Sequence, residues 1–118
     1  MIACISALEP TLIFEGDCEC EVLVVQINTG NDTTRIIAGY GPQECAPDIV
    51  REKYRSTVES QIERSYLAGC MVLVAEDANA KLGPNIIPND PNEMSDNGKL
   101  FHGMIQRQDL SIMNNSNK

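Results

Sequence analysis

Apolar residues recur along this chain in two spacings, one typical of strands and one typical of helices. Residues 20–28 and 33–40 are rich in Val, Leu and Ile, which favour a pleated, half-buried strand. Residues 29–32 form a short polar turn between them, so an antiparallel hairpin is the simplest arrangement. A further short strand is expected around residues 12–14, ahead of the turn signal at residues 15–17.

Residues 47–66 have the spacing of a helix, with an apolar side chain at every fourth position. The apolar stripe consists of Val50, Tyr54, Val58, Ile62 and Tyr66. The charged residues away from the stripe are expected to face solvent, namely Arg51, Glu52, Glu59, Glu63 and Arg64. Gly69 is expected to close this helix. A second helix is predicted at about residues 99–108, with an apolar side made of Leu100, Phe101, Met104 and Ile105.

Residues 71–75 are an uninterrupted apolar run, which predicts a strand buried on both faces. A last strand is expected at residues 110–113. The order strand-strand-helix-strand-loop-helix-strand predicts an α/β fold with a mixed sheet and helices on one face. Because the strands look apolar on both sides, we expect the other face to need a cover that this chain lacks.

Polar residues follow the central apolar run at once, and they suggest phosphate chemistry. Ligands of open α/β sheets bind beyond the carboxyl ends of the strands, where Asp77 and Asn79 would emerge. The two side chains point the same way if the strand geometry continues. Asp77 is suited to bind Mg²⁺ or to orient a water, and Asn79 to donate to a phosphate oxygen. Residues of these types also form strand-end turns and helix N-caps, and the local pattern alone favours that interpretation.

Two further features lie near this corner in the predicted fold. Tyr40 ends the preceding strand, just before Pro42, where its hydroxyl could reach a cleft; the pattern alone favours a half-buried edge tyrosine whose hydroxyl meets water. Residues 83–97 are a polar connection rich in Pro and Asn. Loops of this length inside a compact chain are usually functional or disordered, so this one is expected to form a wall of the site.

Several other functional classes are disfavoured. A calcium loop starting at Asp77 fails because Lys81, Leu82 and Pro88 stand where it needs an oxygen ligand, Gly and Glu. A structural zinc site is disfavoured because Cys18-x-Cys20 has no second ligand pair and His102 is the single histidine. Neither a dinucleotide fingerprint nor a P-loop is present.

Composition bounds the cellular context and the partners. The 118 residues suit one small domain, and the net charge of −8 disfavours autonomous electrostatic binding of DNA. The chain has no apolar stretch long enough for a transmembrane helix, and its start makes a poor signal peptide. Five cysteines without such a signal favour reduced thiols in an intracellular protein, with Cys70 a buried, inert thiol.

Five segments in order along the chain carry a resemblance to a known family. They are residues 35–44 (RIIAGYGPQE), 76–84 (EDANAKLGP), 87–91 (IPNDP), 97–100 (NGKL) and 109–114 (DLSIMN). With their spacing they resemble the endonuclease/exonuclease/phosphatase superfamily, and within it the endonuclease domain of non-LTR retrotransposon reverse transcriptases. The resemblance covers about residues 20–115.

The resemblance implies a fold and an activity. The family's fold is a four-layer α/β sandwich, and its members cut phosphodiester or phosphomonoester bonds with Mg²⁺ or Mn²⁺. It implies a DNA-nicking endonuclease in which Asp77 orients the attacking water or binds metal, Asn79 contacts phosphate or metal, and Tyr40 lies near the scissile phosphate. Glu76 replaces the Gly of the family's motif, which is expected to add negative charge beside the phosphate site.

The resemblance also places this chain in the middle of the family's domain. It puts the family's main metal-binding Glu before Met1 and its catalytic His after Lys118; neither Ser95-Asp96 nor His102 matches the motif of that His. Residues 1–118 are therefore expected to be a single partial domain. The alternative is an inactive truncated remnant that binds a partner or self-associates through the uncovered sheet face.

Overall fold

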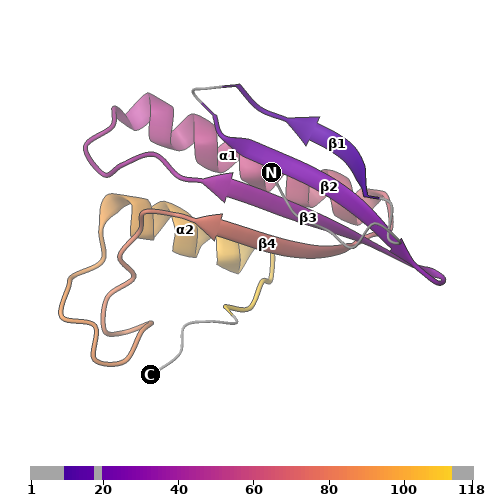
Figure 1. Cartoon of the computed structure of the whole chain (residues 1–118). Coiled ribbons are helices and arrows are strands. Elements are labelled where there is room, and N and C mark those ends of the chain that lie inside the picture. Colours follow the sequence, from indigo (N-terminus) through magenta and orange to yellow (C-terminus); the bar gives the residue numbers. More distant parts are fainter. Residues whose placement is uncertain (1–9, 18–19, 113–118) are drawn as a thin grey trace.

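In the computed structural model, which describes residues 10–17 and 20–112, one sheet is covered by a layer of helices (Figure 1). The strands are β1 (Thr11–Glu15), β2 (Val22–Thr29), β3 (Asp32–Tyr40) and β4 (Met71–Asp77), and the helices are α1 (Asp48–Leu67) and α2 (Asp96–Arg107). Both helices lie on the same side of the sheet. The chain therefore has the predicted α/β architecture, with a single helical layer.

The sheet has the order β1-β2-β3-β4 and is mixed. β1 with β2 and β2 with β3 are antiparallel, whereas β4 runs parallel to β3, as the arrows in Figure 1 show. The parallel pair is connected by α1, because parallel neighbours need a crossover that returns the chain to the same end of the sheet. β3 and β4 consequently end side by side, and this edge carries the polar residues singled out in the sequence.

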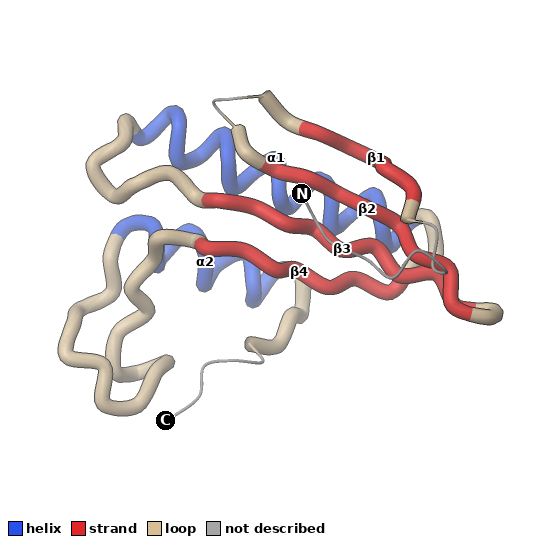
Figure 2. The backbone as a smooth tube through the Cα atoms, in the orientation of Figure 1, coloured by secondary structure: helices blue, strands red, loops and turns tan. Residues whose placement is uncertain are grey.

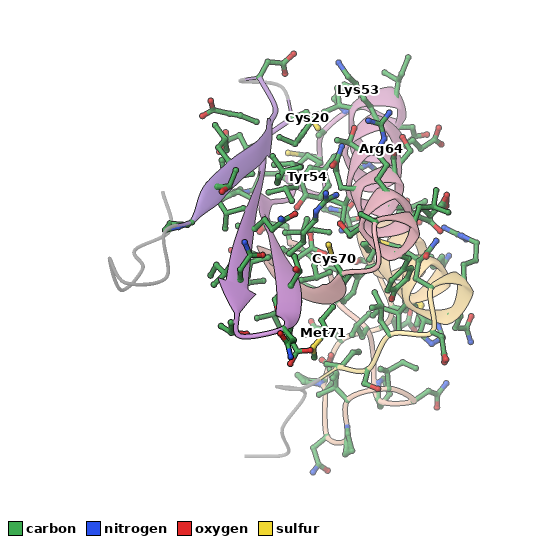
Figure 3. All side chains as sticks on the ribbon, turned by 90° about the vertical axis from the view of Figure 1, so that its right-hand side faces the viewer. Cys20, Lys53, Tyr54, Arg64, Cys70 and Met71 are labelled. Carbon is green, nitrogen blue, oxygen red and sulfur yellow. The ribbon has the colours of Figure 1, made fainter. Side chains whose placement is uncertain are left out.

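The core fills the space between the sheet and the helices. Figure 3 shows the two layers edge-on, with Tyr54 between them. The predicted α1 stripe is confirmed in its middle, where Tyr54, Val58 and Ile62 are buried against the sheet, and Met104 of α2 is buried with them. The stripe fails at its end, because Tyr66 is exposed.

The other face of the sheet differs from the expectation for the 71–75 run. Side chains of β4 alternate, so Val72 and Val74 pack toward the helices while Met71 and Leu73 keep 62% and 44% of their surface exposed. The strand is therefore buried on one face and open on the other. The expectation of an apolar, uncovered face is confirmed at β4, but not at β2, where Val25 and Ile27 are buried.

Two further expectations on local structure are wrong. Residues Leu110, Ser111 and Ile112 are not in a strand, and the end of the predicted strand at Met113 lies outside the described residues. α2 begins at Asp96, three residues before the predicted start, because the Ser95 hydroxyl accepts a hydrogen bond from the Gly98 N–H and caps the helix. Within the described part of the chain, neither helix has the length and apolar character to cross a membrane.

Candidate functional site

The carboxyl ends of β3 and β4 bring two of the three predicted site residues together. Tyr40 and Asp77 are partners in the parallel register, so their side chains leave the same face at neighbouring strand ends. Both are exposed, Tyr40 by 50%. The exits of the two strands stay in close contact beyond this pair, since the Gly41 N–H donates to the Asp77 carbonyl at 2.6 Å. A Cβ at Gly41 would lie 2.7 Å from the Ala78 carbonyl oxygen, so only glycine fits this approach.

Asn79 does not continue the strand. The side chains of Asp77 and Asn79 were expected to point the same way only if it did. Its backbone takes a left-handed conformation with φ at 48°, which Asn tolerates better than most residues. The Asp77 carboxylate accepts a hydrogen bond from the Asn79 N–H at 3.1 Å, and the Asn79 amide donates to the Gly41 carbonyl at 2.6 Å. The Asp-Ala-Asn segment is thus a turn, and Asn79 fastens it to the end of β3.

Asn97 joins this turn to α2. Its side chain is buried, with 4% exposed, and its amide nitrogen donates to the Pro42 carbonyl at 3.0 Å and to the Asn79 carbonyl at 3.1 Å. One amide therefore holds the segment after β3 and the turn after β4 at the N-terminus of α2. From the sequence, Asn97 was placed at the end of the polar connection that precedes the helix, so its role in joining these segments was not predicted.

A charged cluster supports the same junction from the side of α1. Arg51, expected to face solvent, is buried and contacts the carboxylates of Glu44, Asp48 and Asp96. Glu44 also accepts from the Asn97 N–H at 3.2 Å, near the start of α2. The electropositive end of a helix favours such a carboxylate. Glu44, in the loop between β3 and α1, therefore links α1 to α2.

Glu76 lies on the opposite face of β4 from Asp77, and it also lines the cavity at the end of β4, where its charge is paired with Arg55. Its side chain is 4% exposed and accepts hydrogen bonds from the Tyr54 hydroxyl at 2.6 Å and the Arg55 guanidinium at 2.8 Å. Arg55, also buried, lies over the rings of Tyr54 and Phe101 at 5.1 and 5.0 Å. Burial, followed by the charge of Glu76, raises the pKa of Tyr54 far above its usual value.

A cavity of about 520 Å³ opens at the corner where β4 ends, and its lining includes Asp77, Asn79, Lys81, Glu44 and Ser95. Tyr40 instead lines a neighbouring cavity of about 400 Å³, together with Glu15 and Glu21. The structure thus places Asp77 and Tyr40 in the linings of two different cavities. Lys81 was noted in the sequence only as an obstacle to calcium, and here it lines the same cavity as Asp77.

The long polar connection contributes less to this cavity than expected. Among residues 83–97, Ser95 alone is in the described lining of this cavity. The loop is closed on itself: the Asp90 carboxylate accepts from the N–H groups of Gly83 and Asn92, and the Ser95 N–H donates to the Lys81 carbonyl. The Ser95 hydroxyl in turn accepts from the Lys81 N–H, which ties the base of the loop to the cap of α2.

Residues suited to metals are sparse in the part of the chain that the structure describes. There, no three His, Cys, Asp or Glu residues gather in a way that could hold an ion. Cys20 and Cys70 are buried free thiols and Cys45 is an exposed one, whereas Cys18 lies outside the described residues. His102 is half-buried on α2. The expected buried position of Cys70 is confirmed.

Comparison of the chain with family models, with curated proteins and with solved structures gave no match.

Proposed function

We propose that the carboxyl edge of β3 and β4 is part of a phosphodiesterase site that depends on a divalent metal and nicks DNA. The observation that carries the proposal is the register pairing of Tyr40 with Asp77 at the ends of the parallel strands β3 and β4, with Lys81 in the cavity that Asp77 lines. The carboxyl ends of parallel strands are where α/β sheets bind ligands. The resemblance of residues 35–44 and 76–84 to nuclease segments supports the same chemistry.

Mg²⁺ or Mn²⁺ fits these residues as an ion shared with the substrate. Mg²⁺ is commonly held by one or two carboxylates together with waters and substrate phosphates, so the exposed Asp77 is sufficient for that mode. The absence of a larger ligand group among the described residues argues against a closed cage made by this chain. A bound ion would stabilise the charge on a phosphate oxygen and help to activate water.

The chain's own residues would act around the phosphate. Asp77 orients the attacking water through its carboxylate. The Tyr40 hydroxyl donates to a phosphate oxygen from the neighbouring strand end, and the Lys81 ammonium offsets phosphate charge. Asn79 keeps its predicted assignment as a phosphate or metal contact, although the structure also gives its amide the task of holding the Gly41 carbonyl.

The test is nicking of supercoiled plasmid DNA by the purified chain with Mg²⁺ or Mn²⁺. Asp77→Ala is expected to abolish nicking, because it removes the water-orienting carboxylate. Asp32→Ala is the matched control, since Asp32 is an exposed carboxylate at the other end of β3. Unchanged nicking by Asp77→Ala would refute the assigned role.

The second candidate is a non-catalytic chain that self-associates or binds a partner through the open sheet face. It is favoured by the exposure of Met71 and Leu73 on β4. Leu73→Lys is expected to weaken association measured by sedimentation, whereas Ile49→Lys, on exposed surface of α1, is not. A monomer with a cooperative melt at micromolar concentration would count against this candidate.

A further inference from the structure

An apolar groove runs along the outer edge of β4, apart from the site at the strand ends. Its volume is about 700 Å³. The walls are formed by β4 on one side and α2 on the other, including Val72, Val74, Phe101, Met104, Ile105 and Leu110. Helix α2 packs on α1 rather than on β4, which leaves the space between α2 and the edge of β4 open.

Over its first five residues the edge of β4 lacks the usual protection of an exposed strand, since its charged residues, Glu76 and Asp77, stand at its end. β4 is the last strand of the sheet, so within the described residues its outer backbone groups face no strand partner (Figure 2). Proteins commonly protect such edges with Lys, Pro or a bulge. Residues 71–75 contain no charge and no Pro, and their pairing with β3 has no break in register. An unprotected apolar edge beside an apolar groove is built to receive another strand.

We propose that this groove binds an extended segment of a partner protein, which adds to β4 as a fifth strand. Its backbone would complete the hydrogen-bond ladder of β4, and its alternate apolar side chains would pack on Phe101 and Ile105. This partner surface is distinct from the catalytic edge, and it adjoins the open face of the sheet through Leu73, which lies in the groove lining.

The charges around the groove favour a basic partner segment over a second copy of the chain. The charged residues in the lining are Glu76, already paired with Arg55, and Asp109. Asp109 lies near the start of β4, since Tyr66, just before that strand, donates to the Gln108 carbonyl. Two copies paired antiparallel through β4 would bring Asp77 of one toward Asp109 of the other. Each copy also carries a net charge of −8. A partner strand with Lys or Arg at its ends would avoid this repulsion between carboxylates.

Fluorescence anisotropy with a defined probe tests the proposal. The probe is a capped, fluorescein-labelled peptide of alternating valine and threonine with a lysine at each end. Saturable binding is expected in the anisotropy titration. NMR spectra of the chain should show chemical-shift changes on β4 and α2 when the peptide is added. A version with glutamate ends should bind at least several-fold more weakly, and a version methylated at alternate backbone nitrogens should lose binding.

A matched pair of protein variants isolates the charge contribution. Asp109→Asn should lower affinity for the lysine-ended peptide by about two-fold to five-fold, the range of an exposed ion pair. Asparagine also tolerates the left-handed φ of 52° at this position, so the fold is retained. Asp32→Asn should leave affinity unchanged. Equal binding of the methylated peptide, no saturable binding, or a dimer of the chain that the peptide displaces would overturn the proposal.

Discussion

Gly39 and Tyr54 form a steric pair whose energetic coupling can be worked out from the structure. A Cβ at Gly39 would overlap the Tyr54 hydroxyl, whereas the next atom of that ring, Cζ, would be 3.3 Å away. The hydroxyl donates to Glu76 at 2.6 Å. Gly39→Ala must therefore move the hydroxyl away from its buried acceptor.

The magnitudes follow from the two contacts. Overpacking a core costs about 1–3 kcal/mol, and losing a hydrogen bond to a charged group costs about 1.5–3 kcal/mol. Gly39→Ala alone is thus expected to lower the free energy of unfolding by roughly 3–4 kcal/mol, and Tyr54→Phe alone by about 2 kcal/mol. In the Tyr54→Phe background the hydroxyl is gone, and Gly39→Ala should cost only about 1 kcal/mol, so the coupling is about 2–3 kcal/mol.

Urea unfolding followed by far-ultraviolet circular dichroism measures this cycle, with four proteins compared at neutral pH. Tyr66→Phe serves as the control background, because Tyr66 lies near the C-terminal end of α1, away from Tyr54, and its hydroxyl bonds to the Gln108 carbonyl. There Gly39→Ala should keep its full cost. If Gly39→Ala costs the same in the Tyr54→Phe background as in the wild type, the assigned packing is wrong.

Two further predictions concern the junctions between elements. Asn97→Ala removes the donor shared by two partly buried carbonyls and is expected to destabilise the chain by about 2–4 kcal/mol, measured by urea unfolding. Hydrogen exchange at Asn79 should rise, and unchanged exchange would contradict the role of Asn97. The hydrogen bonds from Arg107 hold the pKa of Glu59 below its ordinary value of 4.5, so the stability they supply is present above that pH and is lost as pH falls through the folded-state pKa. Arg107→Leu should therefore flatten the fall of the urea midpoint between neutral pH and about pH 3; an unchanged slope would contradict this.

Local patterns in the sequence predicted most of the framework. The period of four predicted α1 because its buried side chains meet the sheet once per turn, and the β-branched runs predicted β2 and β3. The start of α2 was misplaced because Ser95 was not recognised as its cap. The last strand was predicted from composition alone. Residues 110–112 are not in a strand and do not pair with β4.

The site was predicted less completely, because its geometry depends on contacts distant in sequence. The position of Asp77 could be predicted, since it follows an apolar run directly. The direction of Asn79 could not, because it depends on a left-handed turn and a bond to Gly41. Burial of Arg51 and Arg55 was missed because their carboxylate partners Glu44 and Glu76 come from other segments. A helical pattern shows which face is charged and not whether the charge is paired.

Paramagnetic broadening by Mn²⁺ tests the proposed site most directly, because it reports where the ion binds without requiring turnover. In the ¹⁵N-labelled chain, small additions of Mn²⁺ are expected to broaden the amide signals of Tyr40, Asp77 and Asn79 first, and Asp77→Ala should remove that effect. Broadening that begins instead around Asp48 and Asp96, or that is unchanged in Asp77→Ala, would contradict a metal site at the ends of β3 and β4.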